Sequence, residues 1–102
     1  MVRILLNRNL KENEVIIGNE GIMNYFFATG VILSRHNDVI LKTTEKNEAK
    51  MFQIIRLWLD IKCVEQQSAT DIKEVELELE GGKTKKCMVY SIVLSKIPPI
   101  RN

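Results

Sequence analysis

The pattern of apolar and polar residues in the first third of the chain predicts a strand followed by a helix. The stretch from Glu14 to Gly18 is a short apolar run that ends in glycine, which is typical of a strand. A helix is expected over about residues 21–34, where apolar side chains cover a broad face. Asn19 is the expected N-cap, because its side chain can accept a hydrogen bond from an early helical N–H group. The broad apolar face predicts that other parts of the protein cover most of this helix.

A second strand and helix follow the first pair. Residues 38–42 combine apolar and β-branched side chains, as in a central strand of a sheet. The second helix is expected to begin near Thr43, Thr44 or Asn47, which are alternative caps, and to end near residue 60 or 61. Its apolar residues recur at helical spacing and are Met51, Ile54, Ile55 and Trp58, with Phe52 and Leu59 widening the row.

The last part of the chain predicts a long β-hairpin. Residues 75–80, VELELE, alternate strictly, so the glutamates face one side of a strand and the apolar residues face the other. Gly81 and Gly82 indicate a two-residue turn, and residues 86–94 are nearly continuous in apolar character, as expected for the return strand. Residues 63–71 fit either the start of a strand or a loop.

These elements occur in the order β-α-β-α-β-β, which predicts an α/β two-layer sandwich. We expect a four-stranded mixed sheet, two helices packed against it and a long C-terminal β-hairpin arm. The length of 102 residues fits a single domain over residues 1–102. Its core is expected at about residues 14–96, between a short N-terminal arm and a C-terminal tail. Residues 1–6 fit either a short extra strand or a loose arm.

Composition narrows the function classes. The net charge of +2 is mildly basic, so charge alone does not indicate a nucleic-acid binder, and the placement of the lysines has to decide. No run of 18 apolar residues exists, which predicts no membrane span. The N-terminal stretch lacks the cleavage site of a signal peptide. We therefore expect a cytoplasmic protein that does not bind a membrane.

The residues with catalytic or metal-binding potential are few. The chain has two cysteines, Cys63 and Cys87, and a single histidine, His36, which are too few for a zinc site of Cys and His ligands within one chain. No serine or cysteine stands near His36 in a catalytic pattern. The sequence therefore predicts a protein that is not an enzyme and that has no metal or cofactor.

Two stretches, VIIGNEGIMNYFFATGVIL and DVILKTTEKNEAKM, resemble the Alba superfamily of small archaeal chromatin and RNA-binding proteins. The resemblance covers roughly residues 14–96 and rests on the strand that ends in Gly18, the sequence Met23-Asn24-Tyr25, and the start of the second helix. It implies a homodimer or heterodimer. It also implies that DNA or RNA is held by the loop after the first strand, by the start of the second helix and by the hairpin arms.

The chain departs from the family pattern where the family carries its charges. The family usually has two lysines after the glycine, and this chain has Asn19 and Glu20. The family has an Arg-Gly-Arg pattern before the second helix, and this chain has Thr44, Glu45 and Lys46. The residues that the resemblance leaves as candidates for nucleic-acid contact are Asn19, Asn24, Tyr25, Lys42, Thr44, Lys46, Lys50, Lys83, Lys85 and Lys86. Those expected at the dimer interface are Phe52, Ile55, Trp58 and Leu59.

Other interpretations of these residues stay open. The hairpin lysines could simply pair with the hairpin glutamates, and Tyr25 could anchor the first helix to the sheet. The main hypothesis is a dimeric protein that binds DNA or RNA through the backbone with little sequence preference. The alternative is a subunit or heterodimer partner that contributes a protein-binding surface to a ribonucleoprotein or chromatin assembly. A small enzyme or ligand-binding domain on the same architecture ranks last, because no motif supports it.

Overall fold

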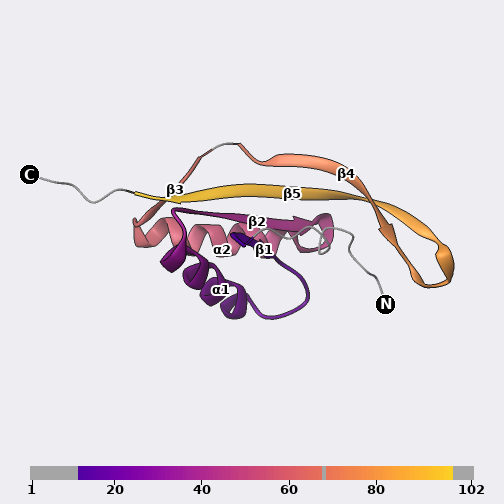
Figure 1. Cartoon of the computed structure of the whole chain (residues 1–102), viewed down its shortest axis with the longest axis horizontal. Coiled ribbons are helices and arrows are strands. Elements are labelled where there is room, and N and C mark those ends of the chain that lie inside the picture. Colours follow the sequence, from indigo (N-terminus) through magenta and orange to yellow (C-terminus); the bar gives the residue numbers. More distant parts are fainter. Residues whose placement is uncertain (1–11, 68, 98–102) are drawn as a thin grey trace, which may run out of the picture.

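The computed structural model describes residues 12–67 and 69–97, and it confirms the predicted α/β class. Figure 1 shows two helices on one side of an open sheet and a hairpin that projects beyond it. In chain order the elements are β1 (Glu14–Ile16), α1 (Ile22–Arg35), β2 (Asp38–Thr44), the 3-10 helix η2 (Glu45–Asn47), α2 (Glu48–Ile61), β3 (Val64–Gln66), β4 (Asp71–Glu78), the 3-10 turn η3 (Glu80–Gly82) and β5 (Thr84–Lys96).

The sheet has five strands instead of the predicted four. β1 pairs in parallel with β2, β2 pairs antiparallel with β5, and β3 and β4 both pair antiparallel with the other edge of β5. The extra strand arises because the strand beside β5 is interrupted. Gln66 pairs with Leu94 and Asp71 pairs with Ser91. Between these two pairs the chain has four residues (67–70) on the side of β3 and β4 and only two (92 and 93) on β5. Residues 63–71, which fit either a strand or a loop in the sequence, thus contain β3 followed by an interruption of the ladder.

Strict alternation along β2 separates the two faces of the sheet. Val39, Leu41 and Thr43 are buried under the helices, whereas their neighbours are only half-buried on the opposite face. The core contributed by the other elements consists of Val15, Ile17, Leu33, Met51, Ile54, Ile55, Val64, Ile92 and Leu94. Three residues of the apolar row predicted for the second helix, Met51, Ile54 and Ile55, therefore lie in this core.

The two helices meet where α1 has a glycine. A Cβ atom on Gly30 would lie 3.2 Å from the indole ring of Trp58 on α2. That indole stacks on Phe26 with ring centroids 4.7 Å apart, and its Nε1–H donates to the Phe26 carbonyl at 3.3 Å. The small residue thus lets α2 place its tryptophan directly against α1.

Helix α1 begins later than its expected cap. Gly21, with extended backbone, holds the N-cap position and no side chain caps the helix, so the prediction of Asn19 as N-cap is wrong. The physical reason is that residues 18–20 form a separate loop ahead of the helix. For α2 the N-cap is Asn47, which also makes no side-chain capping bond.

The long hairpin is confirmed, and it forms an arm (residues 74–88) that projects beyond the rest of the sheet (Figure 1). The last pair between β2 and β5 joins Thr44 to Val89, so only β4 and β5 pair with each other in the arm. The turn is longer than the predicted two residues. It comprises Glu80–Gly82, closed by the Leu79 N–H, which donates to the Lys83 carbonyl at 2.7 Å. The two glycines, at φ 82° and 76°, supply the left-handed backbone that this turn requires.

The arm has two chemically different faces. The Cys87 face carries Val75, Leu77, Lys85 and Cys87, and the Glu76 face carries Glu74, Glu76, Glu78 and Lys86. The alternation predicted for VELELE therefore holds in the structure. The predictions for residues 1–6 and for the tail after residue 97 fall outside the described residues.

Candidate nucleic-acid interface

The loop between β1 and α1 is bonded to Tyr25. The Tyr25 hydroxyl oxygen accepts hydrogen bonds from the backbone N–H groups of Gly18 at 2.9 Å and Glu20 at 3.1 Å. Free N–H groups at such a turn would suit a phosphate. Here both are occupied by the phenol, so Tyr25, a predicted contact residue, also fixes the loop.

Lys50 reaches the same loop from α2. Its Nζ donates to the carbonyls of Gly18 at 2.8 Å and Glu20 at 2.7 Å, and it lies 5.9 Å from the centre of the Tyr25 ring. A lysine predicted to contact nucleic acid therefore contacts the protein's own backbone. The two other predicted residues of this region, Asn19 at the loop and Asn24 in the first turn of α1, are exposed.

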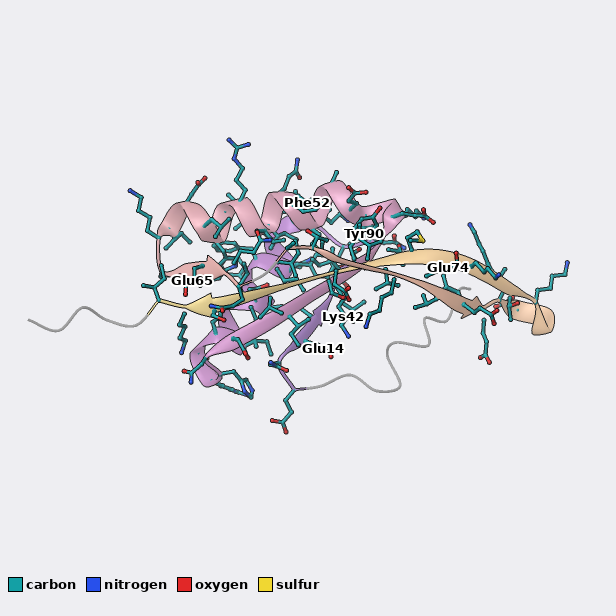
Figure 2. All side chains as sticks on the ribbon, turned by 90° about the horizontal axis from the view of Figure 1, so that it is seen from above. Glu14, Lys42, Phe52, Glu65, Glu74 and Tyr90 are labelled. Carbon is teal, nitrogen blue, oxygen red and sulfur yellow. The ribbon has the colours of Figure 1, made fainter. Side chains whose placement is uncertain are left out.

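Lys42 lies on the sheet face opposite the helices and is paired with Glu14. Its Nζ is 3.2 Å from the Glu14 carboxylate, and the side chains are 23% and 3% exposed, respectively. Figure 2 shows the two labelled side chains together, from neighbouring strands. Because a nearly buried carboxylate compensates its charge, Lys42 contributes little positive potential to the surface.

Lys46 stands at the base of the arm. It is exposed on η2, which follows directly after Thr44, and Thr44 pairs with Val89 of β5. Thr44 is half-buried, and its side chain makes no capping bond to η2. The neighbouring Glu45 lies close enough to the arm to act electrostatically on Cys87.

The three hairpin lysines are exposed but point in different directions. Lys83 follows the turn, Lys85 belongs to the Cys87 face, and Lys86 belongs to the Glu76 face. Lys86 lies 3.8 Å from Glu74, which Figure 2 labels on the arm. Such an exposed pair contributes little to stability, so the ammonium group can exchange this partner for a phosphate.

Burial, and after it nearby carboxylates, raise two pKa values at the arm base. Burial raises the pKa of the Cys87 thiol, and the charge of Glu45 raises it further. Burial also raises the pKa of the Tyr90 hydroxyl, which hydrogen-bonds to the side chain of Glu48. The arm base therefore combines Lys46 with two acidic neighbours.

The structure brings the predicted cations into two groups. Lys83, Lys85 and Lys86 lie near the tip of the arm and Lys46 lies on η2 at its base, and we call these four exposed residues the arm lysines. Lys42 and Lys50 have partners within the protein. Sequence reasoning missed these two partnerships because each joins residues about thirty positions apart.

Of the four residues predicted for the dimer interface, two are packed within the chain and two are exposed. Ile55 is buried in the core of its own chain, and Trp58 is half-buried against α1. Phe52 and Leu59 are exposed on α2, where Figure 2 labels Phe52. Other large apolar residues are also exposed, namely Met23, Phe27 and Val31 on α1 and Ile72 on β4. Sequence reasoning did not select them, although the i, i+4 spacing of the three residues on α1 is visible in the sequence.

Residues 12–67 and 69–97 contain no group of three or more His, Cys, Asp or Glu side chains that could hold a metal ion. Neither helix in these ranges is long and apolar enough to cross a membrane.

The fold and the arm define a small two-layer α/β domain with an open sheet and a projecting hairpin. No family model matches the sequence, and no curated protein matches it either. Solved structures do match. Alba from Thermoplasma volcanium has a TM-score of 0.71 at 21% identity, covering 82% of this chain and 100% of that chain. ALBA1 from Trypanosoma brucei has a TM-score of 0.67 at 13% identity, covering 85% of this chain and 71% of that chain. The protein therefore has the Alba fold, which confirms the resemblance at the level of structure.

Proposed function

We propose that this protein binds DNA or RNA through the phosphate backbone, with little sequence preference, and that it does so as a dimer. The observation that carries the proposal is the set of exposed arm lysines, three near the tip of a projecting hairpin and one at its base. Each phosphate that a lysine neutralises releases condensed counterions, so this arrangement favours binding that weakens as salt rises. The Alba fold supports the proposal, because the family resemblance implies nucleic-acid contact by the same hairpin.

The dimer part of the proposal rests on exposed apolar surface. Phe52 and Leu59 lie seven positions apart on α2, so they share one side of the helix. Ile72 on β4 pairs with Tyr90 and is half-exposed. Large exposed apolar side chains favour a protein partner, and a second copy of this chain is the simplest one.

The acidic side of the arm supports an alternative. The Glu76 face carries three glutamates and one lysine, so its charge suits a basic protein surface more than a phosphate backbone. Under this alternative the protein is a subunit or heterodimer partner in a ribonucleoprotein or chromatin assembly. A non-enzymatic role and a location in the cytoplasm or on the chromosome form part of both proposals.

A salt titration of binding separates the two functions. Fluorescence anisotropy of a labelled DNA duplex and a labelled RNA hairpin is measured between about 50 and about 200 mM salt. We expect the logarithm of the affinity to fall linearly with the logarithm of the salt concentration. Lys85→Ala should reduce the slope on duplex DNA by about 0.9 if this lysine neutralises one phosphate.

Lys96→Ala is the matched control, because Lys96 is also exposed but lies at the opposite end of β5. It should leave the slope unchanged. Absence of binding to either nucleic acid at the lowest salt, by a protein that remains dimeric, would refute the main proposal and favour the alternative. Equal slopes for the two variants would show that Lys85 makes no phosphate contact.

A further inference from the structure

Most backbone polar groups of the loop between β1 and α1, and of Ile17 just before it, are bonded within the protein. The Ile17 carbonyl accepts from the Thr43 hydroxyl at 2.8 Å, and the Ile17 N–H donates to the Lys42 carbonyl at 2.8 Å. Gly18 and Glu20 each use their N–H on Tyr25 and their carbonyl on Lys50. Two side chains from different helices thus hold the same two residues of the loop.

We infer that Lys50 and Tyr25 are positioning residues, which hold this loop so that Asn19 contacts a neutral group of the nucleic acid, a sugar hydroxyl or a base edge. Lys50 itself makes no phosphate contact. The inference deepens the proposed function and rests on it. It assigns the loop a different role from the arm, because the arm binds through charge and the loop binds through an uncharged amide.

The geometry of Lys50 carries the first half of this inference. An ammonium group has three N–H donors, and two of them are on the carbonyls of Gly18 and Glu20. The Nζ also lies over the Tyr25 ring. The protein therefore holds two of the three donors of Lys50 and leaves a phosphate only the third, whereas Lys46, four residues earlier, is exposed and has no ion pair within the described residues.

The chemistry of Asn19 carries the second half. Asn19 is exposed between the two residues that Tyr25 and Lys50 hold, and no hydrogen bond from its side chain occurs among the described residues. Its amide can both donate and accept, which suits a hydroxyl or a base edge. The exposed carboxylate of Glu20 next to it repels a phosphate, so a neutral group is the preferred contact.

The experiment compares Lys50→Met with Lys46→Met in the same salt titration on an RNA hairpin and a DNA duplex. Lys46→Met should flatten the salt slope on the duplex by about 0.9. Lys50→Met should weaken binding severalfold and leave the slope unchanged, because it removes no phosphate contact. Asn19→Ala should have the same two effects. The double variant with Asn19→Ala and Lys50→Met should bind no more weakly than the weaker single variant, since both changes remove the same contact.

Two outcomes would overturn the inference while leaving the proposed function intact. A slope change for Lys50→Met equal to that of Lys46→Met would show that Lys50 contacts a phosphate. Additive decreases in affinity for Asn19→Ala and Lys50→Met would show that Lys50 does not act through Asn19.

Amide hydrogen exchange tests the loop without any nucleic acid, and Tyr25→Phe provides a second variant that removes only a hydroxyl. The amides of Gly18 and Glu20 should exchange faster in both Tyr25→Phe and Lys50→Met than in the parent protein. Unchanged exchange would refute the positioning role. If the parent protein binds no nucleic acid, the proposed function and the contact by Asn19 both fail, whereas faster exchange would still support the positioning of the loop.

Discussion

Thr43→Val is the substitution that best isolates how the core holds the candidate loop. The Thr43 side chain is 1% exposed, and its hydroxyl donates to the Ile17 carbonyl at 2.8 Å. Ile17, the last residue before the loop, is also 1% exposed. Valine has nearly the same shape as threonine, so the change removes the hydrogen bond without opening a cavity.

The size of the effect follows from the acceptor that is left behind. A hydrogen bond between neutral groups contributes about 0.5–1.5 kcal/mol net, and a buried carbonyl without a donor costs about 1–3 kcal/mol. The added methyl group regains part of this free energy through apolar burial. We expect Thr43→Val to lower the free energy of unfolding by about 1–3 kcal/mol. For a domain of this size, each kcal/mol lowers the Tm by about 4–8 °C.

Urea unfolding followed by circular dichroism measures this change. The titration is done at two protein concentrations, because dimerisation would make the apparent stability depend on concentration. Thr44→Val is the control, since Thr44 faces the other side of β2 and its side chain makes no capping bond. It should change the free energy by less than about 0.5 kcal/mol. Equal stability of Thr43→Val and the parent protein would refute the view that this hydroxyl anchors the loop.

Three further predictions concern the packing of the two helices, the exposed face of α2 and the thiol at the arm base. Gly30→Ala should lower the Tm in thermal unfolding although alanine favours helices, because the new Cβ would lie 3.2 Å from Trp58. The same substitution should destabilise the protein less when Trp58→Phe is also present. If Phe52 lies at the proposed dimer interface, Phe52→Glu should give monomers in sedimentation equilibrium, whereas Phe27→Glu, at another exposed helical phenylalanine, should not. No effect of Phe52→Glu on the association state would refute an interface at this face of α2. Because the pKa of Cys87 is raised, the unfolded chain loses that proton first, so stability should be constant below about pH 8.5 and fall above it. Urea titrations across this pH range test the effect, and Cys87→Ala should flatten the fall.

The periodic parts of the fold are the parts that the sequence predicts well. Alternation in residues 75–80 and the helical spacing of Met51, Ile54 and Ile55 identify faces that the structure does bury or expose as expected. These patterns succeed because each depends on one element packing against a single neighbouring layer. The β3 strand was harder to predict, since three residues are too few to show a period.

The candidate site was predictable in its residue types but not in their partners. Lys42 and Lys50 look like surface cations in the sequence, and only the folded chain brings Glu14 beside one and the loop carbonyls beside the other. The apolar face of α1 was expected to be covered, but Phe27 and Val31 are each more than half exposed in the single chain. Contacts of this kind depend on tertiary geometry, which local patterns do not encode.

The most direct test of the proposed binding mode is a map of the surface that changes when nucleic acid binds. Backbone amide chemical shifts are recorded by NMR as a short RNA hairpin or DNA duplex is added to the protein. We expect the shifts to concentrate at Lys46, Asn19 and residues 83–86, with little change at Lys42 or at the far end of β5. An absence of shifts at saturating nucleic acid, or shifts centred on Lys42 and Glu14, would contradict binding by the arm and the loop.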